Sequence, residues 1–332
     1  MVVDNSTTLW ITTGSRTSAR HHELMPTPLR PLPGSLEGRP FAVSAAVQAG
    51  VGRARLRHER LVRPAHGLRT PTPPRTLAQA TAALALVLPQ PWAWSHLTAA
   101  ELHGLPVRHP WQPGDRLVVT RPTHAGPVRR PEIHGRLGME RRALTLVGGM
   151  PVVSPYATWR DLVETLPRDD AVVMGDALAA WPHTAEEDQL GLTSLVRLEA
   201  EVLNRTHSHG GPAAQRAFAL VRAGSRSPME TRARLVFADA GLPEPELNAA
   251  IYDEGQWVAM VDFLWRGQRV IVEYQGDHHR SSRSQWMADV DRMEMLRDLG
   301  WLVIPMTARH VSHLDAKDAF LARLRGELLR RA

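Results

Sequence analysis

The distribution of apolar and polar residues is most regular in the last third of the chain. There, apolar residues recur at helical spacing in three segments and alternate or cluster in four strand-length segments. The pattern predicts a helix, three strands, a helix, a strand and a final helix, over residues 227–240, 247–253, 257–264, 269–275, 284–299, 301–306 and 316–331. We therefore expect an αβββαβ core of the restriction-endonuclease-like kind in residues 226–332.

A second pattern lies closer to the N-terminus, in residues 41–80. A short helix that stops at Gly50 is followed by another helix over 52–59 and by a hairpin-like segment over 61–69. Two short helices followed by a basic hairpin are typical of a winged helix-turn-helix. Residues 1–40 lack apolar periodicity, so we expect a flexible tail there.

The intervening residues 81–210 are patterned less regularly. Helices are predicted over 77–88, 95–104, 158–166 and 192–204, and strands only over 117–119 and 151–154. We expect a middle α/β domain that is mainly helical, within a multidomain α+β protein. The histidines of this region are scattered and are not spaced as ligand pairs, so we interpret them as structural.

The distribution of charge along the chain indicates where a nucleic acid could bind. The formal net charge is +6 over 332 residues. Residues 41–80 hold seven basic side chains and one acidic one, whereas residues 227–332 are net −2. A local basic cluster typically marks a nucleic-acid contact, although a solvated arginine-rich surface has the same composition. The arginines expected to bind nucleic acid are Arg53, Arg55, Arg57, Arg63 and Arg69.

Composition also excludes several classes of protein. The chain has no cysteine, which rules out disulfide scaffolds, thiolate zinc sites and cysteine nucleophiles. The longest purely apolar run, residues 82–88, is too short to span a bilayer. The N-terminus shows no secretory signal pattern. We therefore expect a cytoplasmic protein without a membrane partner.

Two acidic residues, Asp262 and Glu273, fall inside predicted strands with apolar neighbours. Ionised carboxylates are costly in such surroundings unless they are paired or bound to a cation. Because a two-residue turn joins the two strands, the carboxylates can converge on one point. Divalent cations such as Mg²⁺ prefer oxygen ligands of this kind, and a cation held there can activate water against a phosphodiester. The alternative is that both are ordinary surface carboxylates.

The sequence around these carboxylates resembles a known nuclease motif. Residues 261–265, Val-Asp-Phe-Leu-Trp, and 272–280, Val-Glu-Tyr-Gln-Gly-Asp-His-His-Arg, resemble the PD-(D/E)XK motif. The closest resemblance is to the family related to very-short-patch-repair (Vsr) endonucleases, which Asp289, Arg292 and the Gly-Trp step at 300–301 also match. The resemblance implies cleavage of DNA that depends on Mg²⁺ or Mn²⁺, with Asp262 and Glu273 as metal ligands.

The same resemblance implies roles for three further residues. Glu230 is the acidic residue of the first helix, and His278 or His279 contacts the scissile phosphate or assists proton transfer. Glu230 also lies three residues after Ser227, so it can instead be the glutamate of a capping box. The two histidines can equally lie in a solvated loop.

One position departs from the motif. Gln275 stands where a lysine is usual, and glutamine supplies neither a positive charge nor a proton. Imidazole titrates near neutral pH, so the adjacent histidines can take over part of that role.

The N-terminal part shows a second, looser resemblance. Residues 41–50 and 61–69 are similar to the winged helix of AbiEi-type antitoxins, and residues 94–100 and 154–162 resemble the region that follows it. The resemblance implies a DNA-binding module and a middle domain that contacts a partner protein.

Together these features predict a metal-dependent DNA endonuclease, targeted by a winged-helix module and acting in DNA defence or repair. The alternative is a non-catalytic DNA-binding regulator or antitoxin that keeps a degenerate nuclease fold. A nuclease that acts on RNA is a third, weaker interpretation.

Overall fold

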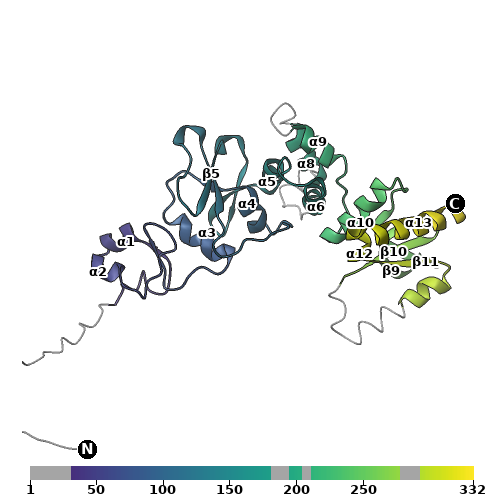
Figure 1. Ribbon diagram of the computed structural model, residues 1–332, viewed down its shortest axis with the longest axis horizontal. Helices are drawn as coiled ribbons and strands as arrows, with labels where there is room; N and C mark the ends of the chain where they lie inside the picture. Colours follow the sequence, from purple (N-terminus) through teal and green to yellow (C-terminus); the bar gives the residue numbers. More distant parts are fainter. Residues whose placement is uncertain (1–30, 181–193, 204–210, 277–291) are drawn as a thin grey trace, which may run out of the picture.

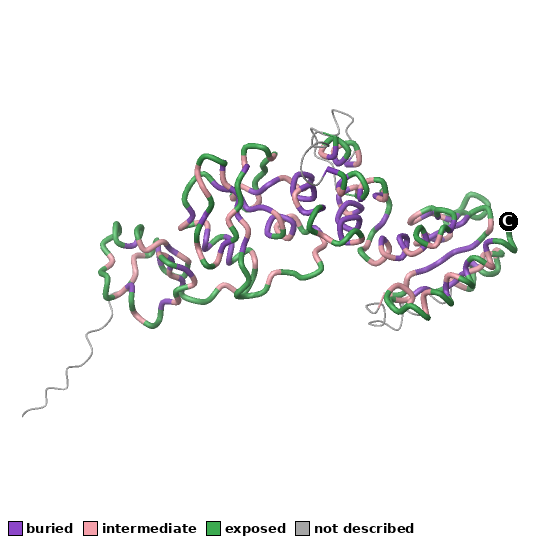
Figure 2. Tube along the Cα trace, turned by 45° about the horizontal axis from the view of Figure 1, so that its top comes forward, coloured by how far each residue is buried: buried purple, intermediate pink, exposed green. Residues whose placement is uncertain are grey.

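The computed structural model describes residues 31–180, 194–203, 211–276 and 292–332 (Figure 1). These residues form a mixed α/β structure with a two-stranded, a five-stranded and a four-stranded sheet. The parts follow one another along the long axis in chain order, and Figure 2 shows buried residues in each of them. Within these ranges, no helix has the length and apolar character of a membrane span.

The N-terminal module contains two short helices and two short strands. Its elements are β1 (Phe41–Ala42), α1 (Val43–Gln48), α2 (Arg53–Leu56) and β2 (Leu68–Arg69). β1 and β2 pair antiparallel, and the predicted basic hairpin is reduced to one bridge between Val62 and Thr70. Gly50 ends the first helical segment with φ +80°, a conformation that glycine adopts without a steric penalty.

A small apolar core holds this module together. It is formed by Leu36, Phe41, Ala46, Leu56 and Leu61. Leu36 comes from the segment predicted to be a flexible tail, so the packed part of the chain begins before residue 41.

The middle region contains a five-stranded sheet, which corrects the prediction of a mainly helical domain. Its elements are α3 (Leu77–Ala85), β3 (Ala93–Trp94), α4 (His96–Leu102), β4 (Leu117–Arg121), β5 (Ile133–Leu137), β6 (Leu144–Val147) and β7 (Met150–Val153), with single 3₁₀ turns at Thr123–Ala125 and Met139–Arg141. The strand order is β5-β4-β3-β7-β6. β3 has only two residues, and β5 and β6 are largely exposed, so none of them shows the apolar alternation by which strands are recognised.

Four helices pack beyond this sheet around Trp159, which is fully buried. They are α5 (Pro155–Leu162), α6 (Arg168–Ala179), α8 (Ser194–Leu203) and α9 (Gly211–Phe218). Ser154 begins α5, because its hydroxyl accepts a hydrogen bond from the Ala157 amide and Pro155 suits the first helical turn. We refer to these four helices as the helical group.

The C-terminal part agrees closely with its predicted elements. It contains α10 (Pro228–Asp239), β8 (Glu246–Asp253), β9 (Gln256–Trp265), β10 (Val270–Gln275), a helical segment over 292–298, β11 (Leu302–Thr307), α12 (Ala308–Ser312) and α13 (Leu314–Arg330). The strand order is β11-β10-β9-β8; β10 and β11 run parallel, and the other neighbours pair antiparallel. Among the described elements of this part, only α12 was not predicted, because five residues are too few to show a helical period. Residues 284–291 of the predicted helix over 284–299 lie outside the described residues.

Helix α10 belongs to two cores at once. Leu235 packs in the core of the helical group, whereas Ala233 and Phe237 pack against the four-stranded sheet. Because one rigid helix contributes to both cores, the sheet of the C-terminal part is joined to the helical group by side-chain packing as well as by the chain.

Candidate active site

Asp262 on β9 and Glu273 on β10 meet where the pairing of these two strands ends. The antiparallel ladder runs from Val270 opposite Trp265 to Val272 opposite Phe263, and one further step puts Glu273 opposite Asp262. In this register the two carboxyl groups are neighbours, and Glu273 is close enough to influence the pKa of Asp262. The structure therefore brings together the two acidic residues that the sequence placed in adjacent strands.

The surroundings of Asp262 disfavour its ionised form. Burial is the main cause that raises the pKa of this carboxyl above its ordinary value, and the negative charge of Glu230 raises it further. The Tyr274 amide opposes this by donating a hydrogen bond of 2.7 Å to Asp262 Oδ2. Arg292 also lowers the pKa by its positive charge. The pair of carboxylates thus lies where an additional positive charge would be strongly favoured.

Glu230 lies in the first turn of α10 and is held from two sides. Its carboxylate accepts hydrogen bonds from the Arg226 amide at 2.9 Å and from the side-chain amide of Asn248 at 2.7 Å. Ser227 caps the helix by accepting from the Glu230 amide at 3.2 Å. Since the glutamate side chain binds the amide that precedes the cap, Glu230 helps to order the helix start while its charge acts on Asp262.

Two contributors to this site were missed or misjudged from the sequence. Asn248, on β8, has φ +44° and also donates to the Gly224 carbonyl at 2.7 Å. Nothing in its sequence neighbourhood indicates that conformation. Arg292, which the sequence singled out only as a match to the nuclease family, lies 3.5 Å from Glu273. Asp289 lies outside the described residues.

Of the remaining predicted residues of the motif, the structure describes only Gln275. Gln275 ends β10, opposite Thr307, and is exposed. His278 and His279 lie outside the described residues.

The donor set suits a divalent cation that keeps most of its water. Among the described residues, no group of three or more His, Asp or Glu side chains is arranged to hold a metal ion. Mg²⁺ is usually bound by one or two carboxylates together with water and phosphate oxygens. Two carboxylates in contact, with a raised pKa on one of them, meet that requirement.

The predicted nucleic-acid-binding arginines divide into two groups. Arg53, Arg57 and Arg63 are exposed, and Arg63 lies across the end of α2 with a hydrogen bond to the Arg57 carbonyl. Arg55 is half-buried. Arg69 donates to the carbonyls of Leu56 and Leu68, both at 2.7 Å, and burial followed by the charge of Arg63 lowers its pKa. The surface open to a polyanion is therefore that of Arg53, Arg57 and Arg63.

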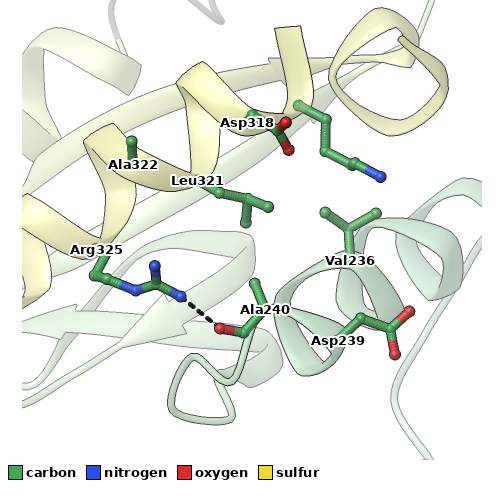
Figure 3. Close-up of a pocket in the computed structure, with 8 residues that line it drawn as sticks. Val236, Asp239, Ala240, Asp318, Leu321, Ala322 and Arg325 are labelled. Atoms are coloured by element: carbon green, nitrogen blue, oxygen red, sulfur yellow. Dashed lines mark hydrogen bonds between the residues drawn. The ribbon is translucent and has the colours of Figure 1, made fainter. Parts of the chain in front are cut away.

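A separate hollow of about 450 Å³ lies between α10 and α13 (Figure 3). Arg325 spans its edge by donating to the Ala240 carbonyl at 2.5 Å. The hollow is lined by Val236, Asp239, Ala240, Lys317, Asp318, Leu321, Ala322 and Arg325. Neither Asp262 nor Glu273 is among them, so this hollow is distinct from the carboxylate pair.

Comparison with known proteins gives distant relatives only. No protein-family model matches the chain. It is 28% identical over 235 residues to two uncharacterized proteins of Mycobacterium tuberculosis, MT2308 of strain CDC 1551 and Rv2248 of strain H37Rv. The match spans 66% of this chain and 79% of each relative.

Proposed function

We propose that the protein is a metal-dependent DNA endonuclease. The observation that carries this proposal is the placement of Asp262 opposite Glu273 at the end of the β9–β10 ladder. Their desolvated position favours a bound cation, and Glu230 adds a third carboxylate charge next to them. The resemblance of the two strands to the PD-(D/E)XK motif of Vsr-like nucleases supplies the reaction.

In this proposal the chain holds and orients the reacting groups. Asp262 and Glu273 would hold Mg²⁺ or Mn²⁺, which supplies Lewis-acid activation of water and stabilisation of the leaving oxygen. The Tyr274 amide fixes the Asp262 carboxylate, and Asn248 fixes that of Glu230. Positioning and electrostatic stabilisation supply most of the rate in such chemistry.

The N-terminal module would deliver the DNA. Residues 41–80, which include its exposed arginines, hold the excess of positive charge of the chain. Residues 227–332 are net −2 and would hold a polyanion weakly on their own. A winged helix-turn-helix reads DNA with its second helix, and α2 is the helix that carries the arginines.

The enzymatic part is tested by cleavage of supercoiled plasmid DNA with Mg²⁺ or Mn²⁺. We expect the wild type to cut, and Asp262→Asn and Glu273→Gln to lose at least about 100-fold in rate, since each removes a charged metal ligand. Asp253→Asn is the matched control, because Asp253 is an exposed carboxylate at the end of β8, next to the β8–β9 turn. A wild type that leaves every DNA substrate intact with either metal would refute the enzyme.

The delivery part is tested by the salt dependence of DNA binding. Deleting residues 1–80 is not a suitable test, because it would remove Ala65, Leu68 and Ala80 from the core under the five-stranded sheet as well as the arginines. Replacing exposed arginines with glutamine leaves that core intact. We expect the salt slope of the full-length chain to fall by roughly one unit for each arginine whose replacement abolishes binding to a phosphate. The residues to replace are Arg53, Arg57 and Arg63.

A second candidate is a non-catalytic DNA-binding regulator. It is favoured by Gln275, which is neutral and exposed at the position where the nuclease motif has a lysine. A regulator would bind a specific DNA sequence with unchanged affinity in Asp262→Asn and would show no metal-dependent cleavage. The plasmid assay and a binding titration of the same variant therefore separate the two functions.

A further inference from the structure

Arg292 lies against the carboxylate pair, although it comes from a different element of the C-terminal third. It is the first described residue of the helical segment over 292–298, and its Nη1 atom lies 3.5 Å from Glu273 Oε1 and 3.2 Å from the Met260 carbonyl. The Arg292 side chain is 31% exposed, whereas that of Glu273 is 10% exposed. The guanidinium therefore lies between the buried carboxylate and solvent.

A site that cleaves DNA needs positive charge in addition to its metal ligands. Glu230 and Glu273 both act on Asp262, and the substrate adds the negative charge of its phosphates. Gln275 contributes no charge, and its side chain is at the exposed end of β10. Among the described residues, Arg292 is a positive side chain in contact with the pair, and its charge also reaches Asp262.

We infer that Arg292 is the cationic residue of this site: without metal it neutralises the Asp262–Glu273 pair, and during cleavage its charge stabilises the scissile phosphate. This inference rests on the proposed endonuclease function. An arginine suits the task because its guanidinium stays protonated and can bind two oxygens at once. The contact with Glu273 positions the guanidinium, so the site has a positive charge although β10 carries no lysine.

The rival explanation is that Arg292 only supports Glu273. The two explanations predict opposite changes in the affinity for a divalent cation when Arg292 is replaced. If Arg292 acts through its charge, removing that charge makes the pair more attractive to a divalent cation. If Arg292 only keeps Glu273 in place, removing it disorders a ligand and weakens metal binding.

The experiment uses the full-length chain with Arg292→Gln, Arg292→Lys and a control, Arg297→Gln, which alters an exposed arginine of the same helical segment. Mn²⁺ affinity is measured by titration of free Mn²⁺ with electron paramagnetic resonance. Cleavage is measured as the single-turnover rate on plasmid DNA at saturating Mg²⁺. Circular dichroism verifies that each variant is folded.

We expect Arg292→Gln to bind Mn²⁺ on the order of tenfold more tightly, because one positive charge near the cation is gone, and to cleave roughly 100 to 1,000-fold more slowly. Arg292→Lys keeps the charge and should restore wild-type Mn²⁺ affinity and most of the rate. Arg297→Gln should match the wild type in both measurements.

Two results would overturn the inference: weaker Mn²⁺ binding by Arg292→Gln, or cleavage by that variant at the wild-type rate. A wild type that binds Mn²⁺ but cuts no DNA overturns the proposed function instead. In that case the Mn²⁺ affinities of the variants still decide whether the charge of Arg292 acts on the pair. A wild type that binds no Mn²⁺ overturns both.

Discussion

Asp176 on α6 should be one of the least replaceable side chains of the protein, because it receives three hydrogen bonds in a buried position. Its donors are Arg234 Nη2 at 2.9 Å, Thr231 Oγ1 at 2.9 Å and the Arg222 amide at 2.8 Å. Asp176 is 1% exposed and Arg234 is 3% exposed. Burial raises the pKa of Asp176, and Arg234 is the first of the groups that oppose this rise.

The size of the effect follows from what Asp176→Ala leaves behind. Arg234 would remain buried with its charge uncompensated, although it would keep a hydrogen bond to the Leu220 carbonyl. Removing one partner of a buried ion pair typically costs about 3–5 kcal/mol, whereas an exposed pair contributes about 0–1 kcal/mol. For a cooperative unit of this size, the loss corresponds to a fall in Tm of roughly 6–20 °C.

Asp239→Ala is the matched control for this prediction. Asp239 forms an ion pair with Arg168 at 2.6 Å, but both side chains are about half exposed. Its replacement should lower Tm by less than about 4 °C. Differential scanning calorimetry of the full-length variants makes the comparison. If the Tm of Asp176→Ala lies within about 2 °C of that of Asp239→Ala, the buried Asp176–Arg234 pair does not stabilise the contact between α6 and α10 as argued.

Two further predictions concern other parts of the chain. Burial lowers the pKa of His96 to about 4, so the unfolded chain binds this proton at a higher pH than the folded chain, and the free energy of unfolding falls as the pH drops from 6.5 towards 4. Urea unfolding should show a loss of about 2–3 kcal/mol between pH 7 and 4.5. This loss should be absent in His96→Asn and present in the exposed control His66→Asn. Asn248→Gly keeps the backbone conformation at φ +44° but removes one of the two hydrogen bonds that hold Glu230, and also the bond to the Gly224 carbonyl, so we expect cleavage to fall about 10 to 100-fold with at most a small fall in Tm; equal rates would show that Asn248 does not position Glu230.

The sequence predicted the C-terminal elements well because those strands are long and bury apolar side chains on both faces. β9 and β10 contribute Phe263, Leu264, Val270 and Ile271 to cores on the two sides of the sheet. The bounds of the four predicted strands lie within one residue of those in the structure. A strong local signal of this kind depends little on the rest of the fold.

The middle sheet was not predicted in full because its stability comes from pairing over long sequence distances. β3 is only two residues long, yet it lies between β4 and β7, and Trp94 faces Val119 on one side and Val152 on the other. A two-residue segment carries no period of its own. Its assignment as a strand depends entirely on neighbours that are 25 and 58 residues away.

The candidate site divides in the same way. The contact between Asp262 and Glu273 follows from strand alternation and a tight turn, which are local properties. The placement of Arg292 depends on how the helical segment over 292–298 packs against the sheet, through Leu296 in the core with Ile271. Residue spacing within the helix does not reveal this contact.

Helix α10 suggests why the candidate nuclease core is joined to the helical group and is not an independent unit. Glu230 in its first turn acts on Asp262, and the next residue, Thr231, is fixed by Asp176 of α6. A shift of α6 would therefore move Thr231 through its hydrogen bond to Asp176. Because Glu230 is the residue before Thr231, the third carboxylate of the site would move with it. Because buried networks of this kind tolerate few alternative arrangements, the helical group contributes to the position of Glu230, together with the Arg226 amide and Asn248. Replacing Asp176 should for that reason lower cleavage as well as stability, whereas replacing the exposed Asp239, at the other end of α10, should change neither appreciably.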